Sequence, residues 1–390
     1  MTDNHKTGTS QPLVPRKYLV TFILITTLFA LWGFANDITN PMVAAFQTVM
    51  ELSAAKASMV QFAFYGGYAT MAIPAALFIR KYNYKSGVLL GLGLYAVGAF
   101  LFIPAAQFQQ FSFFCISLYV LTFGLAFLET TANPFILSLG DKNTATRRLN
   151  LAQAFNPVGS LSGMAVASAG ELIFSSLPEC EKAAIRLHDL AVIRDPYVAI
   201  GLVVLVMFLI ILCVKMPVTD HKGEKISAGE TLRRLWKNHH YTWGVLTQMF
   251  YVAAQIMVWT FIIQYADNLG IDKATAQLYN IVAMGLALTF RFLGTYIMKY
   301  LPHTMLTVFG IGAALCTTGA ILWVGMGGLI CLVAISAFMS IMFPTIYGIA
   351  LENVHERDTS LGAAFLVMAI VGGALMPPLH GMIIDQKVLF

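Results

Sequence analysis

Long apolar runs without charge constrain this chain more than any other feature of its sequence. The run AIGLVVLVMFLIILCV at 199–214 is one of them, and about 20 mostly apolar residues span the hydrocarbon core of a bilayer as a helix. Eleven stretches meet this description: 18–43, 57–80, 85–107, 111–139, 148–176, 196–216, 241–267, 273–300, 303–325, 327–352 and 359–385. The sequence therefore predicts an all-α polytopic membrane protein, because the strands of a membrane barrel are short and alternate apolar with polar residues.

Composition and the distribution of charge agree with this prediction. The chain is 58% hydrophobic and only 11% charged, a balance that a water-soluble domain does not need. If the N-terminus is cytoplasmic, most lysines and arginines fall in connections on that side, including Arg80 with Lys81 and Arg147 with Arg148. The positive-inside rule therefore places the N-terminus in the cytoplasm. The net charge of +5 then reflects membrane topology, and no nucleic-acid partner is expected.

The long polar inner segment at 217–240 divides the chain into two halves. We expect a cytoplasmic tail at 1–17, a six-helix bundle at 18–216, the loop at 217–240 and a second bundle at 241–390. FLETTANPFILSLGD in the first half resembles FMSIMFPTIYGIALEN in the second, with Pro134 opposite Pro344. Such internal repeats are typical of transporters with paired bundles around a central site. The second half has one span fewer than the first, so the expected pattern lacks a twelfth helix.

Charged and amide side chains inside the first-half spans mark the candidate site. A charge at membrane depth costs about 2.5–3.5 kcal/mol, yet Asp37 and Glu129 lie in expected spans. Amides accompany the two acids: Asn36, Asn40, Asn133, Gln153 and Asn156. Their spacing predicts pairs on shared helix faces: Asp37 with Asn40, Glu129 with Asn133, and Gln153 with Asn156. We expect the three faces to meet at one watery cavity, in which the amides bind substrate.

Asn-Pro pairs recur beside these residues, at Pro41, Pro134 and Pro157. A proline has no amide hydrogen, so each one releases the carbonyl four residues earlier, which for Pro157 is the carbonyl of Gln153. Released carbonyls that face a cavity can accept hydrogen bonds from sugar hydroxyls or water. The alternative is that the prolines only kink the helices and the amides hold neighbouring helices together.

Glu129 has no basic residue near it in sequence, and apart from residues in the first or last few positions of a span, Arg291 is the only Lys or Arg inside an expected span. A carboxyl group in a low-dielectric site is stabilised in its protonated form, so it can take up and release a proton. We therefore expect Glu129 to carry the coupled proton. The alternative is a permanently protonated Glu129 that joins helices. Arg291 lies near the inner end of its span, where we expect a gate or a helix anchor.

The second half presents aromatic and amide side chains and no acid at membrane depth. Its first span, WGVLTQMFYVAAQIMVWTF, carries four such residues three or four positions apart on one face: Gln248, Tyr251, Gln255 and Trp259. Aromatic faces stack on the C–H surface of a sugar, and amides bind its hydroxyls. We expect this face to recognise the substrate. The alternative for the aromatic residues is a belt at the membrane interface.

Motifs along nearly the whole chain resemble those of one family. They are LWGFAND, FYGGYATMAIPA, YKSGVLLGLGLYAVGA, LETTANPF, RLNLAQAFN, YVAAQ and AFMSIMFPTI. The chain resembles the major facilitator superfamily, and within it the fucose/galactose/glucose:proton symporters. By this resemblance, one acid in the first helix and one in the fourth couple a proton to a hexose. Glu129 falls on the fourth-helix acid, whereas Asn40 stands where the first-helix acid is found.

Asp37 lies one helical turn before Asn40, at an asparagine position of the family pattern. We expect it to replace the first-helix acid as a second proton-coupling residue. The alternative is an outer-cavity or structural role, with Glu129 carrying the coupling alone.

The resemblance implies a major facilitator fold, with two six-helix-type bundles around a central cavity. It implies import of L-fucose with a proton by alternating access, through a monomer in the bacterial cytoplasmic (inner) membrane. The expected partners are therefore the sugar, the proton and the lipid bilayer. A symporter for glucose, galactose or another hexose is the alternative.

Other classes of function fit the sequence less well. A channel would need a continuous polar stripe along its pore, and the polar residues here are confined to mid-span positions. A solute sensor that does not transport would need a signalling domain, which no segment is long enough to supply. No HExxH, P-loop or GxSxG motif occurs, so an enzyme is not expected. The five cysteines are scattered, and neither a metal nor a cofactor is predicted.

Overall fold

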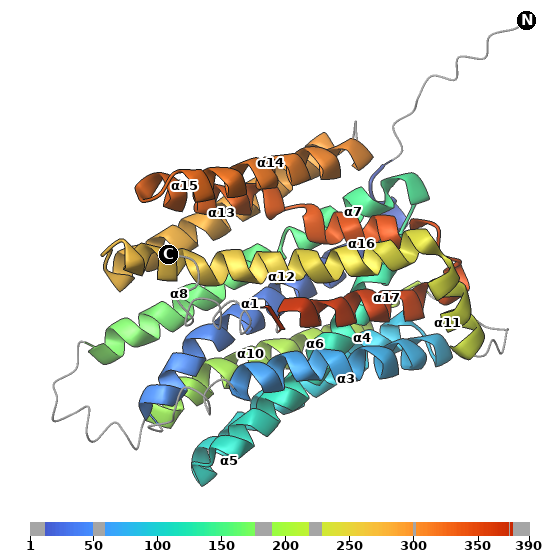
Figure 1. Ribbon diagram of the computed structural model, residues 1–390. Coiled ribbons are helices and arrows are strands. Elements are labelled where there is room, and N and C mark those ends of the chain that lie inside the picture. Colours follow the sequence, from blue (N-terminus) through green and yellow to red (C-terminus); the bar gives the residue numbers. More distant parts are fainter. Residues whose placement is uncertain are drawn as a thin grey trace, which may run out of the picture.

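Helices make up all the regular secondary structure in the described part of the chain. The structure is a computed structural model that describes residues 12–49, 59–175, 189–217, 228–298, 302–373 and 375–376, and Figure 1 shows its arrangement. The α-helices are α1 (Leu19–Val49), α3 (Met59–Lys81), α4 (Tyr84–Phe100), α5 (Phe102–Phe108), α6 (Phe111–Ser138), α7 (Ala145–Gln153), α8 (Asn156–Ser175), α10 (Asp189–Cys213), α11 (Ala228–Lys237), α12 (His239–Asn268), α13 (Lys273–Ile297), α14 (Pro302–Leu322), α15 (Met326–Met339), α16 (Met342–Glu352) and α17 (Thr359–Met368). Short 3-10 helices are η1 (Arg16–Tyr18), η2 (Lys142–Thr144), η3 (Glu356–Asp358) and η4 (Ala369–Val371).

Within the described residues, 8 helical segments are long and apolar enough to cross a membrane. They are Arg16–Asn36, Tyr84–Phe108, Phe111–Ser138, Arg194–Cys213, His239–Asn268, Thr275–Ile297, Thr304–Leu322 and Met326–Glu352. Of the other expected spans, 57–80 corresponds to α3, and 148–176 to α7 followed by α8. The last, 359–385, begins with α17 and runs beyond the described residues. The prediction of an all-α polytopic membrane protein is confirmed.

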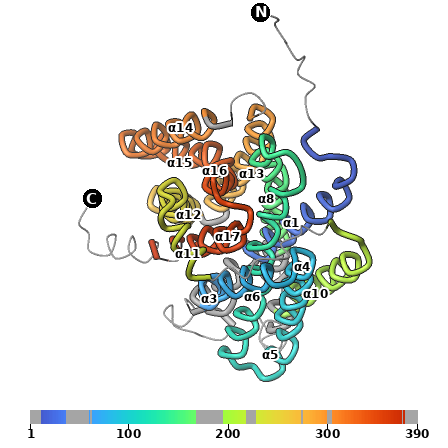
Figure 2. Tube along the Cα trace, turned by 90° about the vertical axis from the view of Figure 1, so that its right-hand side faces the viewer, coloured from blue at the N-terminus to red at the C-terminus, as the bar shows by residue number. Residues whose placement is uncertain are grey.

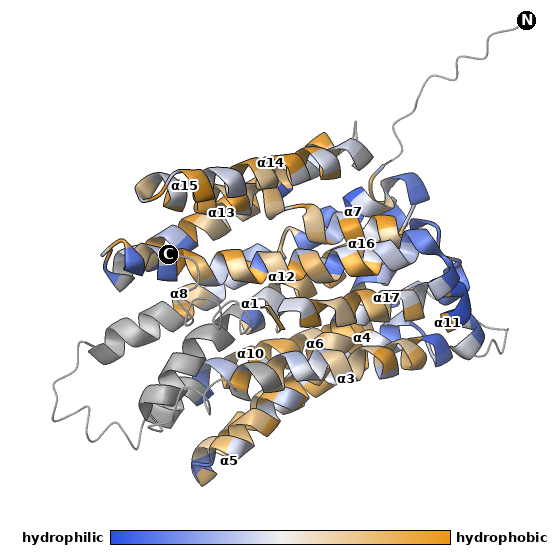
Figure 3. Cartoon of the chain, in the orientation of Figure 1, coloured by the Kyte–Doolittle hydropathy of each residue, from blue (hydrophilic) through white to orange (hydrophobic). Residues whose placement is uncertain are grey.

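Lipid-facing and buried faces differ as expected for helices in a bilayer. Leu202 and Val206 of α10, like Leu315 and Leu322 of α14, are more than half exposed. Figure 3 shows apolar residues along the bodies of the helices and hydrophilic residues gathered where α11 lies. Because lipid covers such apolar faces, close packing rather than water exclusion must hold the helices together.

Small residues allow this close packing, most clearly between α1 and α8. A Cβ atom added to Gly159 would lie 1.8 Å from the carbonyl oxygen of Ala30, and one on Gly33 would lie 2.0 Å from that of Asn156. No larger side chain fits at either position unless the two helices separate. The two glycines therefore allow α8 to pack directly against the backbone of α1.

The helices form two groups that meet at one end of the molecule. We call α1 to α10 the first group and α12 to α17 the second group, and Figure 2 shows them side by side. The groups contact each other where α16 packs on α7, α13 on α7 and α8, and α17 on α3 and α6. The helix α11 lies at one end of the molecule, on the right in Figure 1, and α7 begins at the same end. We call this the α11 end.

Candidate functional site

Glu129 lies on a deeply buried part of α6. Every residue from Leu125 to Ile136 is buried, and Glu129 itself is 3% exposed. Among the described residues, its Oε2 atom has no hydrogen-bond partner, and none of the ion pairs involves it. A buried polar atom without a partner is destabilising by about 1–3 kcal/mol. This site therefore favours a bound proton, water or ligand group at Glu129.

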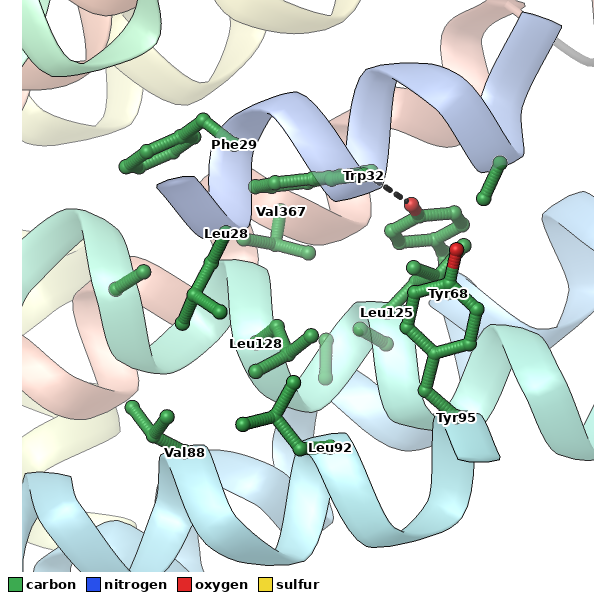
Figure 4. Packing of buried hydrophobic residues seen from close by; sticks show 14 of the residues in the cluster. Leu28, Phe29, Trp32, Tyr68, Val88, Leu92, Tyr95, Leu125, Leu128 and Val367 are labelled. Atoms are coloured by element: carbon green, nitrogen blue, oxygen red, sulfur yellow. Dashed lines mark hydrogen bonds between the residues drawn. The ribbon is translucent and has the colours of Figure 1, made fainter. Parts of the chain in front are cut away.

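Tyr68 of α3 approaches Glu129, and Trp32 of α1 holds the Tyr68 hydroxyl. Trp32 donates from Nε1 to the hydroxyl oxygen of Tyr68 over 2.8 Å, and both side chains are buried, as Figure 4 shows. Tyr68 lies close enough to Glu129 to interact with it electrostatically. Since Trp32 uses the hydroxyl as an acceptor, the hydroxyl hydrogen of Tyr68 can be donated to a carboxylate or a ligand. Both residues lie in motifs of the family resemblance, LWGFAND and FYGGYATMAIPA, but neither was predicted as a site residue.

Asn133, one turn after Glu129, links α6 to α7 and faces the second group. Gln153 donates from Nε2 to Oδ1 of Asn133 over 2.8 Å, while Nδ2 of Asn133 has no well-aligned partner among the described residues. Tyr347 of α16 lies beside Asn133 and Glu129, and its hydroxyl forms no well-aligned hydrogen bond there. Buried polar atoms that could form further hydrogen bonds therefore come from both groups and lie close together beside Glu129. Tyr347 was missed from the sequence, although it lies three residues after the Pro344 of the internal repeat.

The chain turns at Ala154 and Phe155, between α7 and α8. The span expected at 148–176 is therefore interrupted between Gln153 and Asn156, and these two side chains bond to different neighbouring helices. Gln153 turns to Asn133, whereas Asn156 donates from Nδ2 to the carbonyl of Phe29 in α1 over 3.3 Å. The amide nitrogen of Asn156 thus joins α8 to α1. This contact agrees with the alternative in which the amides hold neighbouring helices together.

The predicted face of α12 points into the protein. Gln248, Tyr251 and Gln255 are all buried. Tyr251 donates its hydroxyl to the carbonyl of Met339 over 2.7 Å, and Trp259 donates from Nε1 to Oγ of Ser336 over 3.3 Å. These bonds direct the face toward α15 rather than toward a membrane interface. Gln248 is 0% exposed, and in the described part of the chain neither its amide oxygen nor its nitrogen has a partner.

Arg291 of α13 connects the two groups. Its side chain is 5% exposed, its Nη1 donates to the carbonyl of Gln153 over 3.0 Å, and its Nε donates to the carbonyl of Ser340. A second bond between the groups runs from Nδ2 of Asn150 to Oγ1 of Thr345 over 3.1 Å. The structure thus places Arg291 at a contact between the groups and not among the polar atoms around Glu129.

The remaining sequence candidates lie in α1. Asn36 is exposed, whereas the side chains of Asp37 and Asn40 lie outside the described residues. Among the residues that are described, no group of three or more His, Cys, Asp or Glu side chains could hold a metal ion.

Charged residues join α11 to the second group at the α11 end. Arg234 donates from Nε to Oδ2 of Asp358 over 2.9 Å and from Nη2 to its Oδ1 over 2.8 Å, and Thr231 donates to Oδ1 over 2.9 Å. Burial acts to raise the pKa of Asp358, but the hydrogen bonds from Arg234 and Thr231 outweigh it and hold the pKa below its ordinary value. Arg80 of α3 donates to Thr231 over 3.4 Å, so this cluster reaches both groups.

Comparisons with known proteins agree on one family. The protein-family model of the Major Facilitator Superfamily matches residues 20–377. The chain is 59% identical over 390 residues to the L-fucose-proton symporter of Haemophilus influenzae, covering 96% of this chain and 91% of the relative. It is 36% identical over 391 residues to the L-fucose-proton symporter of Escherichia coli, covering 95% and 88%.

A solved structure gives the same result for the fold. The major facilitator transporter FucP in the outward conformation matches with a TM-score of 0.85 and 33% sequence identity, over 95% of this chain and 93% of that chain. The matched proteins are transporters by name, as the sequence analysis predicted in preference to enzymes. This chain therefore belongs to the Major Facilitator Superfamily of membrane transporters.

Proposed function

We propose that this chain is a proton-coupled sugar symporter that imports L-fucose by alternating access. One observation carries the proposal: buried polar atoms from both groups, on Glu129, Asn133 and Tyr347, lie close together, and no well-aligned hydrogen bond from the described residues satisfies them. A sugar carries a hydroxyl group on most of its carbons, and each hydroxyl can donate and accept. Such a ligand would satisfy these atoms, and the named function of the two L-fucose-proton symporter relatives supports L-fucose as the sugar.

Glu129 is the proposed proton carrier, with Asp37 as a second coupling residue. Glu129 is buried without an ion pair among the described residues, so its charged form is poorly stabilised there. Tyr68 and Asn133 present hydrogen-bond donors that can stabilise the charged form after the proton leaves. A change in protonation would therefore alter hydrogen bonds on both sides of the interface between the groups.

Sugar recognition is proposed for amide and aromatic residues of both groups. They are Asn36, Asn40, Asn133, Gln153, Asn156, Gln248, Tyr251, Gln255 and Trp259. Gln248 and Asn133 have the strongest support, because each is fully buried and has at least one amide atom without a well-aligned partner among the described residues. Tyr251 and Trp259 already donate to the protein, so we expect their rings, rather than their donors, to contact the sugar.

The arrangement of the groups supports a conformation that is closed at the α11 end. Arg291, Asn150 and Arg147 all donate hydrogen bonds across the interface there, and Lys142 pairs with Glu356 over 2.8 Å. Because basic residues concentrate at this end, we assign it to the cytoplasm, with the N-terminus inside and the chain in a bacterial inner membrane. Residues from both groups of one chain form the candidate site, so we expect the monomer to be the transporting unit.

Uptake by proteoliposomes tests this proposal. The purified chain would be reconstituted with an alkaline interior, and radiolabelled L-fucose, galactose and glucose would be supplied outside. We expect accumulation of L-fucose that a protonophore abolishes, with weaker or no accumulation of the other two sugars. Preferential accumulation of galactose or glucose would replace L-fucose with the alternative substrate. Sugar entry that is unaffected by the pH gradient would contradict proton coupling, and liposomes without protein provide the baseline.

A further inference from the structure

Both carbonyls that hold Arg291 precede a proline by four residues. The carbonyl of Gln153 would normally accept from the amide of residue 157, and that of Ser340 from the amide of residue 344. Residues 157 and 344 are Pro157 and Pro344, which have no amide hydrogen to donate. Arg291 donates to these two carbonyls. A single guanidinium group thus takes the place of two helical amide donors that prolines remove.

The helical hydrogen-bond ladder is interrupted at both places, although the backbone of Ala154, Ser340 and Ile341 keeps right-handed helical dihedral angles. The interruptions lie at Ala154 and Phe155 between α7 and α8, and at Ser340 and Ile341 between α15 and α16. The first break belongs to the first group and the second break to the second group. Arg291 lies between them on α13, with a side chain that is 5% exposed. A buried guanidinium keeps its charge and needs acceptors, so loss of either carbonyl would leave charged donors unsatisfied.

We propose that Pro157 and Pro344 are positioning residues that create a conformational lock, composed of Arg291 and the carbonyls of Gln153 and Ser340. Ser340 belongs to the same group as Arg291, so their bond persists when the groups move and it aims the guanidinium. Gln153 belongs to the other group, so its bond to Arg291 breaks when the site opens at the α11 end. Pro157 keeps the carbonyl of Gln153 free to close the lock again. This inference rests on the alternating access of the proposed function.

Restoring the amide hydrogen at position 157 tests the lock. In Pro157→Ala, the new amide competes with Arg291 for the carbonyl of Gln153, so the lock weakens while the charge of Arg291 stays. The matched control is Pro74→Ala, because Pro74 also lies inside a helix, α3, and its exposed side chain is remote in sequence from both helix breaks. Arg291→Met removes both bonds, and Arg291→Lys keeps the charge but cannot present a planar fork to two carbonyls.

Spin labels would report the opening directly, without sugar or a proton gradient. Cysteines replacing Asn143 of the first group and Asn353 of the second, both exposed near the α11 end, would be labelled in a chain whose native cysteines are changed to serine. Electron–electron double resonance in lipid nanodiscs then gives the ratio of long to short distances. We expect Pro157→Ala and Arg291→Met to raise this ratio by about tenfold or more, as for loss of a hydrogen bond to a charged group. Arg291→Lys should raise it less.

A distribution for Pro157→Ala that matches the parent and Pro74→Ala would overturn the lock, provided that all variants elute as folded monodisperse protein. Should Arg291→Met fail to fold, Pro157→Ala still decides the question. The result is independent of the uptake assay. If the distances shift in Pro157→Ala but the parent chain transports no sugar, the lock is supported and the proposed function is contradicted. If the parent chain shows proton-driven uptake but the distances do not shift, the proposed function is supported and the lock is contradicted.

Discussion

The first and second groups of helices contribute different chemistry to one interface. The first group provides the buried acid Glu129, surrounded by the hydroxyl of Tyr68 and the amide of Asn133. In the second group, the described acids lie at helix ends, and the buried polar residues are amides, aromatics and Arg291. We propose from this difference that the first group alone binds the proton, whereas both groups contact the sugar and the second group closes the site through Arg291. Coupling then depends on contacts that cross between the groups.

The groups also differ in how their polar side chains are held. Around Glu129, side chains bond to side chains, as Trp32 does with Tyr68 and Gln153 with Asn133. In the second group, Tyr251 and Arg291 donate to the carbonyls of Met339 and Ser340 at the break between α15 and α16. A side-chain network can rearrange when a proton binds, whereas backbone acceptors stay in place. We therefore expect a change in the protonation of Glu129 to rearrange the bonds around it more readily than those at the break between α15 and α16.

The largest effect is expected for the second acid of the first group. Asp37→Asn should reduce pH-driven sugar accumulation in vesicles to passive equilibration, because one of two coupling carboxyls is lost. The double variant Asp37→Asn with Asn40→Asp moves the acid by about one helical turn on nearly the same face, so it should partly restore accumulation. Full accumulation by the single variant would restrict coupling to Glu129.

A smaller effect, with opposite signs in two assays, is expected for Gln248→Leu in the second group. The substitution removes buried amide atoms that have no partner, so the sugar-free protein should become more stable, by about 1–3 kcal/mol. Sugar affinity should fall by about tenfold, because the leucine offers the sugar no hydrogen bonds. Thermal melting and calorimetry measure the two effects. Tyr251→Phe is the comparison, because losing its bond to Met339 should lower stability. Unchanged sugar affinity in Gln248→Leu would remove Gln248 from the site.

Tyr347→Phe tests the contact between the groups with a minimal change. The ring remains and only the hydroxyl beside Asn133 and Glu129 is lost. We expect sugar affinity to fall by about 2- to 10-fold, which is the loss of one ordinary hydrogen bond, without loss of the fold. Equilibrium binding of labelled sugar would show this, and affinity equal to that of the parent would mean that the hydroxyl does not face the ligand.

The smallest effect is expected at the α11 end, where Asp358 links α11 to the second group. A carboxyl group whose pKa is lowered by folding adds stability above its unfolded-state pKa, about 3.9 for aspartate. That stability is lost as pH falls through the lower folded-state pKa. The melting temperature of the detergent-solubilised parent should therefore decline on acidification below about pH 4. Asp358→Asn should melt lower at pH 7 and lose less on acidification. Equal pH dependence in both proteins would contradict this assignment.

Sequence patterns predicted the fold and several members of the site for identifiable physical reasons. The length of an apolar run by itself indicates a membrane-spanning helix. A charged residue such as Glu129 or Arg291 is easily recognised inside such a run. The break between α7 and α8 was not predicted, because a proline near a turn and a proline inside a continuous helix look alike in sequence. Pro134 lies inside α6, whereas Pro157 follows a break.

Tyr68, Trp32 and Tyr347 were missed for a different reason. Aromatic residues are common in membrane helices, and their spacing does not show which ones approach a distant carboxyl group. Tyr347 reaches Glu129 from a helix more than 200 positions later in the chain. Only the packing of the two groups brings them together. The carbonyl acceptors of Arg291 were also hidden, since backbone atoms carry no sequence signal except through the prolines that release them.

The most direct test of the division between the groups is sugar-induced proton uptake by Glu129→Gln. Purified protein in lightly buffered detergent solution would receive L-fucose while a pH electrode records proton uptake, and calorimetry would measure sugar binding in parallel. Glutamine keeps hydrogen-bonding capacity but cannot titrate, so we expect no proton uptake, with sugar affinity within about tenfold of the parent. Tyr251→Phe should still take up protons once sugar is bound. Proton uptake by Glu129→Gln equal to that of the parent would contradict the account, because the coupled proton would then bind elsewhere.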